Sequence, residues 1–222
     1  MPKRPALITG FAPYGGRGRN PAAEIAKTLD GTSFSGISVV GRLLPVSFGQ
    51  IAARTAKLLE ELQPVVVLSI GLWPGEPLIR IERAALNVAD FEIADNDGCR
   101  AHDEPVLGNG TAAKLSSVPL RKIEAALLAA GIPARVSNTA GTFLCNACLY
   151  SFLSAAEATS QRTSCGFLHV PYTPEQVAAL LQELKQQGRL EAHQRADLAS
   201  MDLATSTRAV QIAVETAIRE SA

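Results

Sequence analysis

The sequence predicts an α/β protein, a single-domain, three-layer α/β/α sandwich built on a mostly parallel, open sheet. Three observations support this prediction. Segments with strand character alternate with segments with helix character along the chain, which is the order of elements in an α/β fold. Residues 64–71, PVVVLSIG, form a continuous apolar run, as expected for a central strand covered on both faces. The 222 residues are 47% hydrophobic and contain no linker-like stretch, so we expect one domain over residues 1–222.

The first elements are indicated by the residues that flank them. Residues 6–9 are expected to form a strand that ends in a glycine-rich turn over residues 10–16. A helix is expected over residues 21–29, because Asn20 can serve as its N-cap and Pro21 suits the first helical position.

The rest of the chain continues the alternation of strands and helices. In order, we expect a strand over residues 37–44, a helix over 50–62, an extended segment over 78–88, a long polar loop over 91–110, a helix over 120–130, a strand over 134–137, a helix over 146–156, a strand over 166–170, and closing helices over 174–187 and 201–219.

Charge and hydropathy exclude several classes of function. The 21 basic and 21 acidic residues leave no net charge, which argues against nucleic acid or an anionic membrane as a partner. No apolar run approaches the roughly 18 residues that span a bilayer, and the basic N-terminus leads into too short an apolar segment for a signal peptide. We therefore expect a cytoplasmic protein with free thiols at its four cysteines, since a chain with an ample core does not need disulfides.

A cysteine and a histidine stand in two apolar segments, Cys145 in AGTFLCN and His169 in GFLHVP. A cysteine hydrolase needs this pair, because the thiolate attacks and the imidazole transfers the proton. If Cys145 lies at or just before the start of the helix over 146–156, the free amides there would lower the thiol pKa from about 8.5 toward neutrality and could bind an oxyanion. The alternative is an ordinary buried thiol.

The choice of base and of orienting acid follows from the surroundings of the candidates. Of the three histidines, His102 and His193 lie in polar segments, whereas His169 is near the end of a predicted strand, where α/β sheets place their sites. It could instead be a core histidine bonded to a backbone carbonyl. Glu82 is flanked by apolar residues and needs a partner if buried. That partner is His169 in one interpretation, and Arg80 or Arg83 in the other.

Metal, redox and phosphate sites are weaker interpretations of the same residues. The spacing Cys145-x2-Cys148 followed by Cys165-x3-His169 matches a zinc site, but on one strand the last two would be roughly 13 Å apart, too far for a single ion. Cys-x-x-Cys without a thioredoxin-like unit around it does not indicate a redox motif. The turn over residues 10–16 lacks the Gly-Lys-Ser/Thr ending of a phosphate loop. We expect no metal and no cofactor.

Several segments occur together along the chain: TGFAPYGG (9–16) with Asn20-Pro21, IERAALN (81–87), DNDG (95–98), SNTAGTFLCN (137–146) and GFLHVP (166–171). Over about residues 6–180 they resemble the signatures of the pyroglutamyl peptidase I (pyrrolidone-carboxylate peptidase) family. The resemblance implies a phosphorylase/hydrolase-like fold and a cysteine omega-peptidase that hydrolyses the amide bond after an N-terminal pyroglutamyl residue of peptides. It assigns Cys145 as nucleophile, His169 as general base and then acid, and Glu82 as the residue that orients the histidine.

The resemblance also implies a pocket for the lactam ring lined by Phe11, Tyr14 and Phe143, and a homotetramer or homodimer. The chain departs from the family pattern at Ala12, Tyr14, the segment 72–77, and Glu92, which stands where a basic residue is common. These departures leave two alternatives open. One is a cysteine amidase acting on another small cyclic or acylated substrate, and the other is a catalytically idle binding protein of the same fold.

Overall fold

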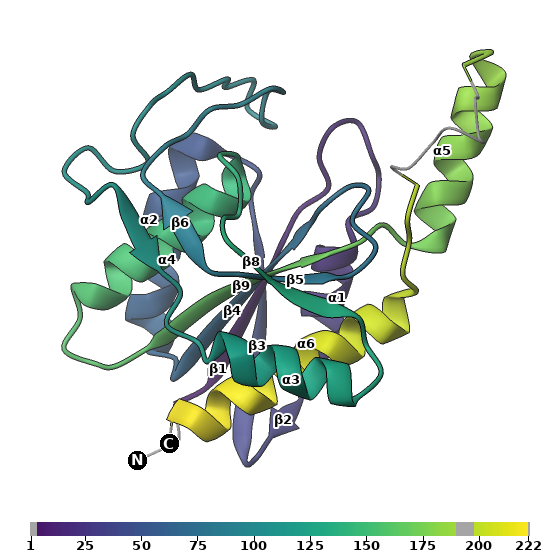
Figure 1. The fold of residues 1–222 in the computed structure, drawn as a ribbon. Coiled ribbons are helices and arrows are strands. Elements are labelled where there is room, and N and C mark those ends of the chain that lie inside the picture. Colours follow the sequence, from purple (N-terminus) through teal and green to yellow (C-terminus); the bar gives the residue numbers. More distant parts are fainter. Residues whose placement is uncertain (1–3, 190–197, 222) are drawn as a thin grey trace.

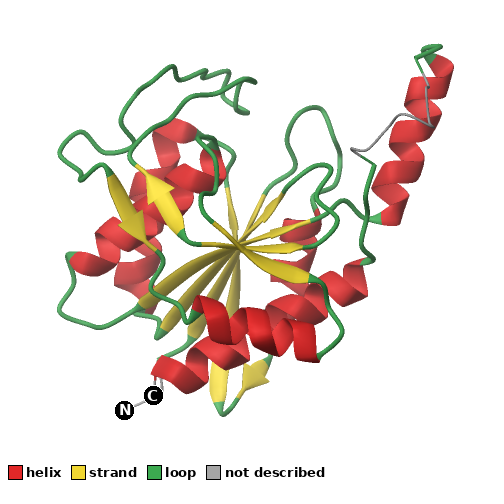
Figure 2. Ribbon diagram, in the orientation of Figure 1, coloured by secondary structure: helices red, strands yellow, loops and turns green. Residues whose placement is uncertain are grey.

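A twisted sheet forms the centre of the computed structural model, which describes residues 4–189 and 198–221 (Figures 1 and 2). In these residues, seven strands form the sheet in the order β2-β3-β1-β4-β9-β5-β8. The strands are β1 (Ala6–Phe11), β2 (Ser33–Phe34), β3 (Ile37–Leu44), β4 (Val66–Leu72), β5 (Ile79–Glu82), β8 (Ala134–Ser137) and β9 (Ser164–Val170).

The sheet is mostly parallel. Strands β3, β1, β4 and β9 run in one direction, while β2 pairs antiparallel with β3, and β5 pairs antiparallel with β9 and parallel with β8. Its central strands alternate the faces to which they contribute, as a period of two requires. In β1, Leu7 packs on one side and Ile8 on the other, and Val67 and Leu68 of β4 do the same.

Helices cover both faces of the sheet, which gives the three predicted layers (Figure 1). On one side lie α1 (Pro21–Leu29), α3 (Leu120–Ala129) and α6 (Leu203–Ser221), and on the other α2 (Phe48–Leu62) and α4 (Leu144–Glu157). A small sheet of β6 (Ala84–Leu86) and β7 (Ala113–Leu115) packs beside α4, and α5 (Pro174–Gln186) projects from the body (Figure 1). None of the helices in the described ranges is long and apolar enough to cross a bilayer.

Several predicted elements are confirmed at their predicted bounds. They are α1, β3 and β8, and the Asn20 side chain accepts the hydrogen bond of the Ala22 N–H at 3.1 Å as the N-cap of α1. The loop over residues 91–110 contains no helix, and besides the bridge between Ala89 and Glu104 it is held by hydrogen bonds such as those of Asp95 with the Phe48 N–H and of the Asn96 N–H with the Val46 carbonyl. A local signal, the cap and the proline, therefore suffices for α1.

The extended segment predicted over residues 78–88 is two strands in two different sheets. The chain turns at Arg83, whose N–H donates to the carbonyl of Ser137 and whose carbonyl accepts from the Ser116 N–H. The short strands β2 and β7 were not predicted from the sequence. Helix α4 begins at Leu144 rather than at residue 146, which places Cys145 inside its first turn.

Candidate active site

The ends of three neighbouring strands bring the site together on one face of the sheet. His169 of β9 is paired with Gly71 of β4 on one side and with Arg80 of β5 on the other. Residues two apart on a strand share a face, so Glu82 lies on the same face as Arg80 and His169. The face is the one covered by α2 and α4, and the first turn of α4 carries Cys145 onto it.

His169 and Glu82 form a buried hydrogen bond. The distance from His169 Nδ1 to Glu82 Oε1 is 2.8 Å, and the two side chains are 1% and 0% exposed. With Glu82 ionised, Nδ1 carries the proton that it donates, so Nε2 of the neutral ring is a proton acceptor. This contact fixes the tautomer and the orientation of the ring, which is what a general base requires.

The thiol of Cys145 and the imidazole of His169 both lie beside Gly71. A Cβ atom at Gly71 would lie 2.7 Å from Cys145 Sγ and 3.0 Å from Cδ2 of His169. Because Sγ and Cδ2 both lie within 3.0 Å of this Cβ position, the distance between them is less than twice 3.0 Å. The sulfur and the imidazole are therefore neighbours above a glycine that leaves room for them, and the candidate residues 145, 169 and 82 lie in one cluster.

The first turn of α4 is fixed by Asn146, which the sequence did not single out. The Asn146 side chain is fully buried and accepts from the Leu86 N–H at 2.7 Å, while its amide donates to the carbonyls of Leu86 and Val88 at 2.9 Å each. Three hydrogen bonds thus hold the start of α4 against β6. The first amides of a helix lack intrahelical partners, and the N–H of Cys145 acts to lower the pKa of its own thiol.

The expectation that the helix N-terminus lowers the thiol pKa is wrong. Burial raises the pKa of the Cys145 thiol well above its ordinary value, the neighbouring Cys148 and Glu82 raise it further, and the N–H of Cys145 offsets only part of this. A helix terminus contributes about 1 kcal/mol, whereas burying an anion costs several kcal/mol. Burial also lowers the pKa of His169, against the opposing effect of Glu82. Both directions favour the uncharged pair, thiol and neutral imidazole, over the thiolate and imidazolium.

The other candidate groups lie apart from this pair. Burial raises the pKa of Cys148 and of Cys165 to about 12, and Cys148 Sγ is 3.6 Å from Ser69 Oγ. His102 is exposed and lies 3.6 Å from Asp90, and His193 is outside the described residues. In the part of the chain that the structure describes, no group of three or more His, Cys, Asp or Glu side chains could hold a metal ion.

A pocket of about 370 Å³ opens over the pair and is mainly apolar. The predicted Phe11, Tyr14 and Phe143 all line it, with ring centroids of Tyr14 and Phe143 6.1 Å apart. Burial raises the pKa of Tyr14, so its hydroxyl is protonated and can donate a hydrogen bond. Two of the departures from the family pattern, Trp73 and Glu92, also line this pocket.

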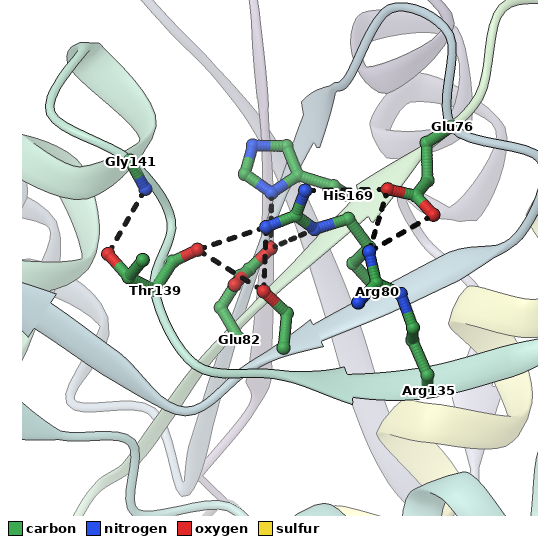
Figure 3. Close-up of polar contacts among 8 residues, drawn as sticks. Glu76, Arg80, Glu82, Arg135, Thr139, Gly141 and His169 are labelled. Atoms are coloured by element: carbon green, nitrogen blue, oxygen red, sulfur yellow. Dashed lines mark hydrogen bonds and ion pairs between the residues drawn. The ribbon is translucent and has the colours of Figure 1, made fainter.

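Glu82 contacts an arginine as well as the histidine (Figure 3). Arg80 Nε donates to Glu82 Oε1 at 3.0 Å, so the two interpretations of Glu82, as partner of His169 and of Arg80, hold together. The second oxygen, Oε2, is buried and has no hydrogen-bond partner among the described residues. Arg80 was not predicted as part of the site, because an arginine two positions from a glutamate on a strand is typical of an ordinary ion pair.

Comparisons with known proteins agree on one family. A family model described as pyroglutamyl peptidase matches residues 4–220. The pyrrolidone-carboxylate peptidase of Pyrococcus furiosus is 43% identical over 77% of this chain and 82% of its own length, and that of Bacillus cereus is 37% identical over 94% and 90%.

Solved structures give the same result. A variant of the Pyrococcus furiosus pyrrolidone carboxyl peptidase superposes with a TM-score of 0.89 at 38% identity, covering 97% of this chain and 98% of that one. The pyrrolidone carboxyl peptidase of Thermococcus litoralis does so with a TM-score of 0.89 at 34% identity, covering 98% and 94%. The predicted fold class and the stated resemblance are confirmed.

Proposed function

The chain belongs to the pyroglutamyl peptidase family, and on that premise we propose that Cys145, His169 and Glu82 are its catalytic residues. The enzyme is a cysteine hydrolase that cleaves the amide bond after an N-terminal pyroglutamyl residue. One observation supports the residue assignment above all others. The carboxylate of Glu82 holds His169 at 2.8 Å, and the ring edge of His169 and the sulfur of Cys145 both lie beside Gly71.

Acylation begins from the neutral pair. As Cys145 Sγ attacks the pyroglutamyl carbonyl carbon, its proton passes to Nε2 of His169 and a C–S bond forms. The imidazolium is stabilised by Glu82, whose charge is already in place. The oxygen of the tetrahedral intermediate receives negative charge, and the free amides in the first turn of α4 are the donors within reach. His169 then gives its proton to the departing amine and the C–N bond breaks.

Deacylation reuses the same residues. A water molecule gives a proton to His169 Nε2 while its oxygen attacks the thioester carbon. The C–S bond breaks, the proton returns to Cys145 and free pyroglutamate leaves. Every proton in this cycle moves between the substrate, water, Cys145 and His169, so no cofactor is required.

The pocket suits a neutral, compact ring. A lactam has no charge to desolvate, whereas a free N-terminal ammonium would have to leave water to enter the apolar pocket. We propose that Phe11, Tyr14 and Phe143 contact the ring, and Tyr14 supplies a hydroxyl that can donate to a lactam or peptide carbonyl. Peptides that carry N-terminal pyroglutamate are the substrates that this pocket favours.

A fluorogenic pyroglutamyl amide tests the assignment. Wild type is expected to release the fluorophore, Cys145→Ser to lose at least about a thousandfold in kcat, and the matched control Cys148→Ser to keep its rate. Full activity of Cys145→Ser, or an equal loss in Cys148→Ser, would reassign the nucleophile. The alternative function is that of an amidase for another small cyclic or acylated substrate, and Trp73 and Glu92 in the pocket lining are the features that suggest it. A panel of pyroglutamyl, prolyl and acetyl amides separates the two functions.

We further propose a cytoplasmic, single-domain homo-oligomer, a dimer or tetramer, without nucleic acid or membrane as a partner. All four cysteines are free and the net charge is zero, which fits a reducing compartment and a small neutral substrate. Helix α5 projects from the body and, in the described chain, has no buried residue, although Val177, Leu180 and Leu184 lie along it. Light scattering on the purified chain measures the oligomeric state.

A further inference from the structure

Arg80 is the most connected side chain beside the catalytic residues (Figure 3). It is 8% exposed. Its Nε donates to Glu82 Oε1 at 3.0 Å, and its Nη2 donates to Ser137 Oγ at 2.7 Å and to the Thr139 carbonyl at 3.1 Å. Its Nη1 reaches Glu76 Oε2 at 3.4 Å. One guanidinium thus contacts four different residues.

The charges require this arginine. Glu82 is fully buried, and burial of His169 works against a positive charge on its ring. A buried carboxylate needs a charged or hydrogen-bonding partner. Arg80 is the cation in contact with Glu82, and Glu76 balances its other side, itself paired with Arg135 at the surface at 3.2 Å.

Arg80 also connects the base to the segment that leads to the nucleophile. Thr139 lies between β8 and α4, in the stretch that ends at Cys145, and its carbonyl is held by Arg80. The guanidinium stacks on Trp73, with Cζ 3.8 Å from the ring centroid. The same indole meets His169 edge to face, with centroids 4.8 Å apart. The arginine therefore contacts Glu82 and the segment before Cys145 directly, and His169 through the ring of Trp73.

We propose that Arg80 is a positioning residue for the hydrolysis, which holds Glu82 aligned on His169 and holds the segment before Cys145 in register with it. This inference rests on the proposed function, because the role given to Arg80 is a role in that hydrolysis. It assigns Trp73 as the surface against which both Arg80 and His169 are held.

The pH dependence of the reaction reports on this role. The charged and titratable groups around His169 are Glu82 and Arg80 from β5, Glu76 from the segment before it, and Cys145 from α4. Glu82 and Glu76 raise the pKa of His169, and Arg80 lowers it. Without Arg80, the pKa of His169 is expected to rise, so the acidic limb of the rate profile moves to higher pH.

The experiment compares Arg80→Met, Arg80→Lys and the matched control Arg135→Met on a pyroglutamyl fluorogenic amide between pH 5 and 9. Arg80→Met is expected to lower kcat by about 10- to 100-fold with little change in KM, and to move the acidic limb up by about one pH unit. Arg80→Lys keeps the charge and the wild-type limb, but its kcat falls because one ammonium cannot replace the fork of donors. Arg135→Met should match wild type.

A structural role alone would lower the melting temperature and leave the limb in place, and that result would overturn the proposal. If Arg80→Met does not fold, Arg80→Lys is the test, with a lower kcat and an unchanged limb as the expected result. An unchanged kcat in Arg80→Lys would also overturn it. NMR of the ring nitrogens and protons of His169 tests the same role without measuring turnover. The downfield Nδ1–H signal, identified by its loss in His169→Gln, should be present in wild type and lost or shifted in Arg80→Met.

The two hypotheses fail in different ways. An inactive wild type, or an active Cys145→Ser variant, contradicts the proposed function and leaves the NMR test of Arg80 intact. An active wild type with an inactive Cys145→Ser variant, together with an Arg80→Met profile that coincides with wild type, contradicts the role of Arg80 alone.

Discussion

Replacing Glu82 by glutamine removes one charge and keeps the shape of the side chain. Glu82 Oε1 accepts from His169 Nδ1 at 2.8 Å in a fully buried position. When the imidazolium forms during acylation, the two charge centres are about 4 Å apart, which corresponds to about 4 kcal/mol at an effective dielectric constant of about 20. Since 1.36 kcal/mol is one factor of ten, kcat is expected to fall about a thousandfold in Glu82→Gln.

The direction in which the pH profile of the rate moves is a second test of this prediction. Glu82 raises the pKa of His169, so its loss moves the acidic limb to lower pH, opposite to the shift expected for Arg80→Met. Steady-state kinetics on a pyroglutamyl amide between pH 5 and 9 measure both quantities, with the surface variant Glu61→Gln as control. A loss of less than about tenfold, or an acidic limb that stays in place or moves up, would refute the reasoning.

Three further changes have defined outcomes. Gly71→Ala places a methyl group 2.7 Å from Cys145 Sγ. It is expected to lower kcat/KM by about 100-fold in steady-state kinetics and stability by about 1–3 kcal/mol in thermal melts. The control Gly49→Ala, with open space around it, should not destabilise the protein. Asn146→Ala breaks three buried hydrogen bonds to Leu86 and Val88 and should cost about 1–3 kcal/mol in denaturant unfolding together with a lower kcat; full activity would contradict its role. The pKa of His169 is lowered from 6.5 and that of Cys145 is raised from 9.0. The melting temperature should therefore fall below about pH 6.5, where the unfolded chain gains a proton at the histidine, and above about pH 9, where it loses a proton at the cysteine. The variant His169→Gln should weaken the fall on the acid side, and Cys145→Ser should weaken the fall on the alkaline side.

Local signals predicted much of the fold. The helix α1 follows from Asn20 and Pro21, and the central strand β4 from an unbroken apolar run, because capping and burial on two faces are properties of a short segment. The division of residues 78–88 into β5 and β6 could not be predicted, since it depends on hydrogen bonds of Arg83 with Ser137 and Ser116, far away in the chain.

The candidate site shows the same contrast. Cys145 and His169 were selected by residue type and neighbours, Glu82 was assigned only by the family resemblance, and the structure brings the three together. The state of the thiol was mispredicted, because desolvation depends on every element packed around Cys145 and not on its own helix. Arg80 and Asn146 were missed, since their partners, Thr139 and Leu86, are distant in sequence. Only the antiparallel pairing of β5 and β9 reveals which charged residues share a face with His169.

Trapping the covalent intermediate tests the central claim most directly. Wild type is mixed with a pyroglutamyl substrate, quenched in acid within the first turnovers, digested and mapped by mass spectrometry. The account predicts one pyroglutamyl group on the peptide that contains Cys145, held as a thioester that alkaline hydroxylamine removes. Product formation with the acyl group on Cys99, Cys148 or Cys165, or with no acylated peptide even when release is slowed at low temperature and low pH, would contradict it.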